Sequence, residues 1–264
     1  MIKFFRKIRK RLLTENKFSK YLLYAIGEIV LVVIGILIAL QINTWNENRK
    51  GAIKEQQILH QLKEDYSLNL LQLEQKIEHR NRIINAGNKI LHYIDAPETV
   101  TSDSLTAQLS IFIGSPTFKP IQNNLISSGD ILLIKNKQLN RLLTSWPSDV
   151  ILIQGIENIW STTMVWETVI PLLTDIEMMR ESSYVWWNDE QNLQWILEEK
   201  SDSPFQKPII KSTLKTREIL EDKRVEGIAT MAVSVNHASN LQSRTIHKRI
   251  REILDLINQE IIKK

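Results

Sequence analysis

The stretch YLLYAIGEIVLVVIGILIAL, Tyr21 to Leu40, decides the architecture of this chain because it holds one charged residue, Glu28, among twenty. An α-helix rises 1.5 Å per residue, so the stretch spans about 30 Å, the thickness of the hydrocarbon core of a bilayer. It is longer than the roughly 7–15 apolar residues of a signal peptide, and Ala39-Leu40-Gln41 is a poor cleavage site. The sequence therefore predicts one uncleaved transmembrane helix.

The charges on the two sides of this helix predict its direction. The first 20 residues carry eight Lys or Arg and one acidic residue, whereas NTWNENRK, which follows the helix, is mixed. Because positively charged flanks stay in the cytoplasm, the N-terminus is expected inside and the rest of the chain outside. Tyr21 and Tyr24 are expected at the inner membrane interface and Trp45 at the outer one, where aromatic residues serve as anchors.

The net charge separates the anchor from the outer part. Residues 1–42 hold eight basic and two acidic side chains, and residues 43–264 hold 26 basic and 28 acidic ones. The basic pI of about 9.1 therefore comes from the anchor, where it suits anionic lipid headgroups. The expected partner is the lipid bilayer, and nucleic acid is not expected.

The outer part is predicted to be all-α. Its apolar residues recur every three or four positions, and the whole chain has eight glycines. A long helix is expected over 54–94, ended by Asp95-Ala96-Pro97, and another over 222–262, and the two should pair in an antiparallel bundle. The predicted domains are a basic cytoplasmic segment (1–20), a transmembrane helix (21–42) and a helical extracytoplasmic domain (43–264).

Shorter helices are expected between these two long ones. Asp103 or Ser104 would cap the first, which ends at Ile113, and Asn136 would cap a helix over 137–146. Residues 131–134 are either a short strand or a helical turn. The remaining helices are expected over 120–128, 147–179, 189–199 and 207–220.

One face of the membrane helix carries small residues and a carboxylate. Its members are spaced by three and four residues, as in a heptad: Ala25, Glu28, Val32, Gly35 and Ala39. Small residues let two helices approach, and polar side chains bond across the contact. This stripe predicts a helix–helix interface in the membrane, with a second copy or with another membrane protein. The alternatives are that Glu28 handles an ion or a proton, or that it is a protonated residue tolerated by lipid.

Tryptophan is concentrated between residues 146 and 195. Trp146, Trp160 and Trp166 lie in predicted helices and are expected in the core. Tyr184, Trp186 and Trp187 lie in SSYVWWNDEQ, a predicted loop, where they either pack inward or form an exposed aromatic patch that could hold a glycan, a peptide or a lipid surface.

No catalytic or metal-binding pattern is present in the sequence. The chain has no cysteine, so it has no disulfide, no thiolate metal site and no cysteine nucleophile. Its five histidines form no metal-ligand spacing and are expected to be solvated helix residues. Glycine-rich phosphate loops and the G-x-S-x-G elbow are also missing. We expect no cofactor, no metal and no enzymatic activity.

Two stretches resemble a known family. MIKFFRKIRKRLLTENKFSKYLLYAIGEIVLVVIGILIALQINTWNENRK, at the N-terminus, and NNLISSGDILLIKNKQLNRLL, Asn123 to Leu143, are similar to an uncharacterised family of single-span membrane proteins from one Gram-negative phylum. The resemblance implies an inner-membrane location with a periplasmic helical domain, and it implies no activity. In that phylum, Asp103-Ser104-Leu105 would fit a short acceptor pattern for O-glycosylation at Ser104.

These observations predict a non-enzymatic, membrane-anchored envelope protein. It would be an accessory or scaffold subunit that binds a partner through its membrane helix and its periplasmic bundle, the partner being another membrane protein or a second copy. The alternative is a periplasmic ligand-sensing domain that signals through a partner membrane protein, which rests on fold analogy alone.

Overall fold

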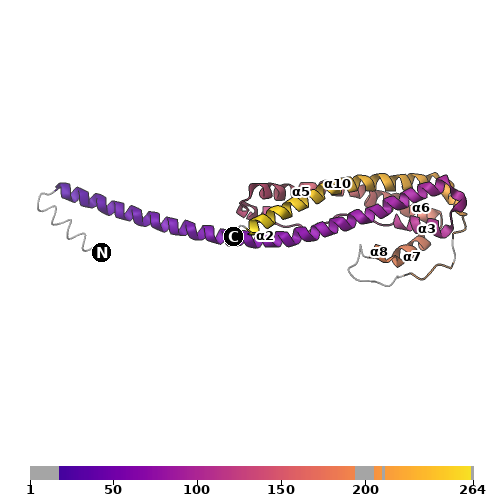
Figure 1. The fold of residues 1–264 in the computed structure, drawn as a ribbon, viewed down its shortest axis with the longest axis horizontal. Helices are drawn as coiled ribbons and strands as arrows, with labels where there is room; N and C mark the ends of the chain where they lie inside the picture. The colour runs from indigo at the N-terminus through magenta and orange to yellow at the C-terminus, as the bar shows by residue number, and fades with distance from the viewer. Residues whose placement is uncertain (1–17, 194–204, 210–211, 263–264) are drawn as a thin grey trace. The chain divides into compact units, whose positions relative to one another are not determined.

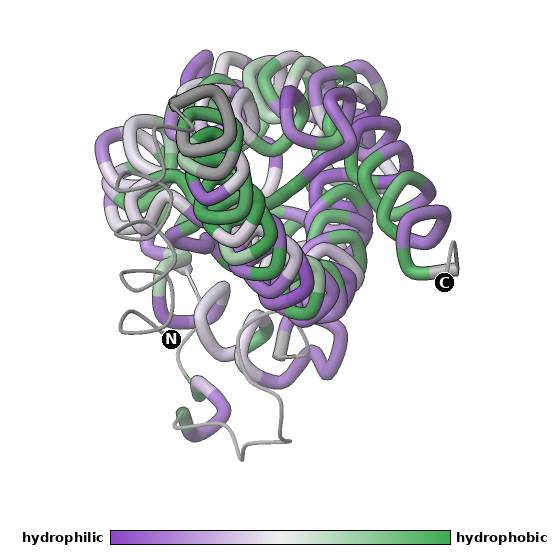
Figure 2. The backbone as a smooth tube through the Cα atoms, turned by 90° about the vertical axis from the view of Figure 1, so that its left-hand side faces the viewer, coloured by the Kyte–Doolittle hydropathy of each residue, from purple (hydrophilic) through white to green (hydrophobic). Residues whose placement is uncertain are grey.

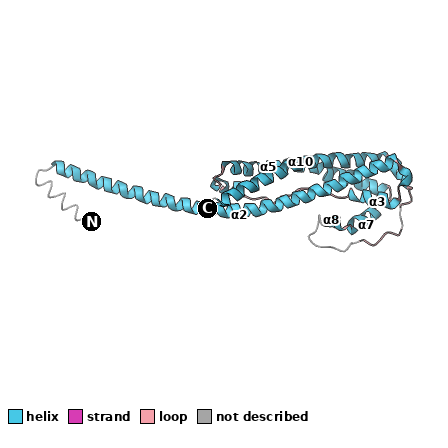
Figure 3. Cartoon of the chain, viewed as in Figure 1, coloured by secondary structure: helices cyan, strands magenta, loops and turns pink. Residues whose placement is uncertain are grey.

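The structure is a computed structural model that describes residues 18–193, 205–209 and 212–262. Every regular element within these residues is helical, and none of them forms a strand (Figure 3). The prediction of an all-α chain is therefore confirmed for the described part. The chain forms two compact units, Met1–Gln57 and Ile58–Lys264. The boundary between the two units, at residues 57–58, reflects how the residues pack. The end of the membrane helix at residues 42–43 stays a prediction.

The apolar stretch lies in helix α2, Phe18–Asp95. Among the described residues, α2 is the one helix long and apolar enough to cross a membrane, and none of its most apolar 18-residue window is buried. Figure 2 draws this part of the tube largely in the green of hydrophobic residues. The predicted start of a separate helix near Lys54 is wrong. Residues 41–57 contain no proline and one glycine, which costs a helix about 1 kcal/mol and does not end it.

The second unit is built on three long helices: the later part of α2, α5 (Lys137–Asn158) and α10 (Lys223–Ile262) (Figure 1). Glu74 of α2 contacts His247 at 2.9 Å, whereas Gly87 lies against Ala229. Residue numbers on α10 fall as those on α2 rise, so the two helices are antiparallel. The predicted pairing of the first and last helices is confirmed.

Helix α5 runs parallel to α2. The rings of Tyr66 and Trp146 lie 5.2 Å apart, and further along both helices Arg80 pairs with Glu157. Two parallel neighbours need a connection that returns along their length. Here the connection begins with η1 (Pro97–Thr99) and α3 (Ser102–Ile111), after α2 has ended at Asp95 as predicted.

An irregular segment, residues 114–124, then returns along α2, and we call it the returning segment. Asn69 accepts the Ile121 N–H at 2.7 Å and donates to the Ile121 carbonyl at 3.2 Å, and Gln72 accepts the Lys119 N–H at 2.9 Å. These bonds hold the backbone away from helical geometry, so the helix predicted over 120–128 is mostly wrong: only α4, Leu125–Ser128, is helical. Gly129, with φ of 76°, then leads into η2 (Asp130–Leu133), so the segment predicted as a strand or a helical turn is a helical turn.

Helix α5 begins at its predicted cap, Asn136, and continues through Pro147, where the sequence predicted a break. Leu143, Trp146 and Val150 are all buried, so one apolar stripe packs on both sides of the proline and keeps the helix together. The chain continues as a π-helix, η3 (Ile159–Val169), and then as α6 (Ile170–Asp175).

The remaining elements are α7 (Met179–Asn188), α8 (Glu190–Leu193) and α9 (Thr216–Glu221). The loop predicted for SSYVWWNDEQ is wrong, since α7 occupies most of it. The helix predicted over 189–199 begins with α8, and residues 194–199 lie outside the described part. Of the helix predicted over 207–220, the described residues are helical only from Thr216 onward.

The apolar core of the second unit is divided into two clusters. On α2, core A covers buried residues between Leu59 and Leu73, and core B covers those between Ile83 and Ile90. On α10, core A lies between Ile246 and Ile257. Core B lies toward the start of α10, from Val225 to Val235. Between the two cores, the long helices contribute buried polar side chains.

Candidate functional site

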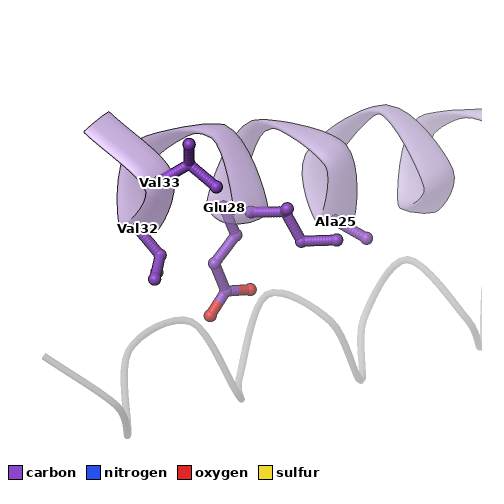
Figure 4. Close-up of a pocket in the computed structure, with 5 residues that line it drawn as sticks. Ala25, Glu28, Val32 and Val33 are labelled. Carbon is purple, nitrogen blue, oxygen red and sulfur yellow. The ribbon is translucent and has the colours of Figure 1, made fainter. Parts of the chain in front are cut away.

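The predicted stripe, Ala25, Glu28, Val32, Gly35 and Ala39, lies entirely within helix α2. Figure 4 shows Ala25, Glu28 and Val32 pointing to the same side of α2, whereas Val33 points away. Ala25 and Glu28 are half-buried, and the remaining stripe residues are exposed. Gly35 has open space around it, because a Cβ added there would meet no atom within 4 Å. Around Gly35 the stripe therefore leaves room for a second helix to approach closely.

The predicted interfacial anchors are described only in part. Trp45 is 63% exposed, and the Arg49 guanidinium carbon lies 6.0 Å from the centre of its ring. This geometry suits a cation–π contact. The side chains of Tyr21 and Tyr24 lie outside the described residues. A role of the three residues at the membrane interfaces stays a prediction.

A buried group, which we call the polar layer, lies between the two cores and consists of Arg80, Glu157, Asn240 and Ser243. The Arg80 Nε donates to Asn240 Oδ1 at 2.8 Å, and its Nη2 donates to Ser243 Oγ at 2.7 Å. Its Nη1 donates to Glu157 Oε1, and the two charged side chains are 1% and 0% exposed. The second carboxylate oxygen of Glu157 accepts the Phe118 N–H at 2.8 Å. The layer thus joins α2, α5, α10 and the returning segment.

The electrostatics of the layer follow from its burial. Burial raises the pKa of Glu157, and the Arg80 charge and the Phe118 N–H act against that rise. Burial lowers the pKa of Arg80, and Glu157 acts against that change. Removing two charges from water costs several kcal/mol per ion, which is offset only when hydrogen bonds satisfy both groups. Because the partners come from three helices, only one relative register of the helices provides this set of bonds.

His79 lies beside the layer and was not predicted to be buried. It is 3% exposed, and a Cβ on Gly114 would lie 2.4 Å from its Nε2. Burial, together with the charges of Arg82, Lys76 and Arg80, lowers its pKa to about 3. The expectation that every histidine is a solvated helix residue is therefore wrong for His79, which is a neutral, packed side chain at pH 7.

The tryptophans divide between the interior and the surface. Trp146 and Trp160 are 4% and 1% exposed, as predicted, but Trp166 is 67% exposed. Trp160, Val165 and Val169 of the π-helix are buried at spacings of five and four residues, and Trp166 lies outside this buried set. The prediction of Trp166 in the core is wrong because it rested on the size of the side chain and its place in a helix, neither of which says which way the side chain faces.

The candidate aromatic patch lies on helix α7. Trp186 is 5% exposed and contacts Trp187 with ring centroids 5.0 Å apart. Trp187 and Tyr184 are half-buried. An exposed patch of all three residues is therefore wrong, because the helix turns Trp186 into the protein, and inward packing accounts for it.

The predicted cap of α3 is also corrected. Thr101 is the N-cap, and its Oγ1 accepts the Ser104 N–H at 3.2 Å. The Ser104 hydroxyl lies 2.8 Å from the same Thr101 oxygen, in the first turn of the helix. O-glycosylation at Ser104 stays a prediction. Within the described residues, no three His, Cys, Asp or Glu side chains are grouped so that they could hold a metal ion.

One part of this chain is similar to a known protein family. Residues 28–97 match DUF6090, a family of unknown function. The match begins at Glu28 and includes His79 and Arg80 of α2. The stretch from Asn123 to Leu143 lies outside it. No curated protein and no solved structure matches the chain.

Proposed function

We propose that this chain is a non-enzymatic, membrane-anchored envelope protein that acts as an accessory or scaffold subunit. It would be held in a bacterial inner membrane by α2, with its N-terminus in the cytoplasm and its helical domain in the periplasm. Its partner would be another membrane protein or a second copy of the chain, bound through the stripe on the membrane helix and through the bundle.

The exposed apolar helix is the observation that carries the proposal. None of its most apolar window is buried, so its side chains need lipid or another helix around them. Glu28 lies inside this helix, and ionisable residues within membrane helices mostly face protein or a water-filled cavity. Small residues beside Glu28 would let a partner helix approach its side chain. The polar layer supports a scaffold role, because it fixes the helices that would present a binding surface.

The proposal is tested by placing a photo-crosslinking amino acid at Val32 in native membranes. We expect a protein adduct, identified by mass spectrometry, either with a second copy or with a different membrane protein. The matched control is Val30, which lies 200° around the helix and faces away from the stripe. Lipid adducts at both positions would reject the helix interface and leave α2 as a simple anchor.

A further inference from the structure

A cavity lies at the end of the second unit where α2 ends and α10 begins. Its volume is about 360 Å³, within the range of small-molecule pockets, which is roughly 300–1,000 Å³. The last turn of α2, η1, α9 and the first residue of α10 surround it. We call it the end cavity, and its lining residues are Ile94, Pro97, Arg217, Leu220, Glu221 and Lys223.

The apolar residues of the end cavity are held in place by the core. Leu220 is 4% exposed and belongs to core B, and Ile94 packs against the same core. Pro97 is half-buried and lies in η1, which contacts α9. The apolar wall is therefore formed before any ligand arrives, and it could take an apolar group out of water.

The polar residues of the end cavity come mainly from α9. Arg217 Nε donates to Glu221 Oε1 at 3.0 Å, and a ligand can reach both side chains because they are 69% and 65% exposed. Within the described residues, Nη1 and Nη2 of Arg217 and Oε2 of Glu221 form no hydrogen bond. Arg217 thus keeps the planar pair of donors that binds a carboxylate in bidentate fashion. Glu221 keeps an acceptor for an ammonium group.

The charges around the end cavity are balanced. Glu221 and Glu98 both lie near the Arg217 guanidinium and raise its pKa. Lys223 Nζ donates to Glu226 at 3.2 Å. Each cation therefore has an acidic neighbour, and no excess of positive charge attracts a simple anion. A ligand that carries both charges would meet an opposite charge at each end.

We infer that the end cavity binds a zwitterionic amino acid with an apolar side chain. The carboxylate of the ligand would accept hydrogen bonds from Nη1 and Nη2 of Arg217, and its ammonium group would donate to Oε2 of Glu221. Its side chain would pack on Ile94 and Leu220. The end cavity does not depend on the partner that α2 binds in the membrane, and such a site would make the second unit a ligand-binding domain.

The test is isothermal titration calorimetry of the full-length protein in detergent, with L-leucine and L-phenylalanine as probes. Isocaproate is leucine without its amino group, and isoamylamine is leucine without its carboxylate. We expect both amino acids to bind and both analogues to bind at least about tenfold more weakly than leucine, since each analogue loses hydrogen bonds to a charged side chain.

Two variants locate the binding. Arg217→Met and Glu221→Gln should each weaken leucine binding by about tenfold or more. Circular dichroism should show that both variants stay folded, because exposed ion pairs contribute little to stability. The matched control is Arg251→Met, which should bind leucine normally, since Arg251 is also exposed and faces Glu74, at 3.7 Å, away from the end cavity.

Three results would overturn the inference: no binding of either amino acid at millimolar concentration, leucine binding unchanged in Arg217→Met, or isocaproate binding as tight as that of leucine. The photo-crosslinker at Val32 reports on the membrane helix alone. Failure of one proposal is therefore distinguishable from failure of the other.

Discussion

Arg80 lies on the face of α2 that is buried in the turns before and after it. One series of positions on α2 alternates at spacings of four and three: Leu62, Tyr66, Asn69, Leu73, Lys76, Arg80, Ile83, Gly87 and Ile90. All of these residues are buried except Lys76, which is half-buried. The sequence could therefore have predicted that Arg80 is buried, and a buried arginine needs a charged or hydrogen-bonding partner. It held no signal for Glu157, because the predicted break at Pro147 hid the position of that residue on a continuous α5.

The substitution Arg80→Met should destabilise the full-length protein by about 3–5 kcal/mol, because it leaves Glu157 charged and buried without its partner. The double variant Arg80→Met/Glu157→Leu should recover part of this loss, since no uncompensated charge remains. The measurement is urea unfolding in detergent, followed by circular dichroism.

Arg217→Met is the matched control for this experiment. Arg217 forms an ion pair with Glu221 at 3.0 Å, and both side chains are largely exposed. Exposed pairs contribute little to stability. If Arg80→Met changed the free energy of unfolding no more than Arg217→Met does, the polar layer would not be a stabilising element.

At the scale of elements, the sequence predicted those that depend on a local signal. Asn136 caps α5, accepting the N–H groups of Gln138 and Leu139, and α10 begins within one residue of its predicted start. The helix predicted over 120–128 failed because that segment depends on a distant residue. The returning segment is irregular because Asn69 binds the backbone of Ile121 across 52 positions of sequence, a partner that no local pattern reveals.

The contact between α2 and α10 depends on a glycine. A Cβ on Gly87 would lie 2.9 Å from the Ala229 carbonyl oxygen and 2.9 Å from Val233 Cγ2. Gly87→Ala should therefore push the two helices apart and destabilise the protein by about 1–3 kcal/mol, as overpacking does. Thermal unfolding of the full-length chain measures the effect.

Gly227→Ala, on α10, should change the stability of the protein in the opposite direction. This position has open space, so alanine should stabilise the helix by up to about 1 kcal/mol through its better propensity. Destabilisation by both variants, or by neither, would mean that close approach at Gly87 does not determine how α2 and α10 pack.

At the scale of the whole molecule, the sequence separates an apolar N-terminal stretch from a helical domain, and the structure adds which contacts hold that domain together. Core A and core B are divided by the polar layer on α2, α5 and α10. The sequence could predict which helices are amphipathic, but it could not predict that α2 and α5 run parallel. That arrangement follows from the returning segment, whose hydrogen bonds to Asn69 and Gln72 are tertiary.

The proposed topology gives the last prediction, which uses the absence of cysteine. Single variants Lys10→Cys and Gly227→Cys would be exposed to a membrane-impermeant maleimide in cells whose outer membrane has been made permeable. We expect labelling of Gly227→Cys alone, with Lys10→Cys labelled only after the inner membrane is broken, because the eight basic residues before the span should stay in the cytoplasm. The reverse pattern would place the bundle inside the cell. Labelling of both variants in intact membranes, together with release of the protein by high salt, would mean that α2 does not span the bilayer.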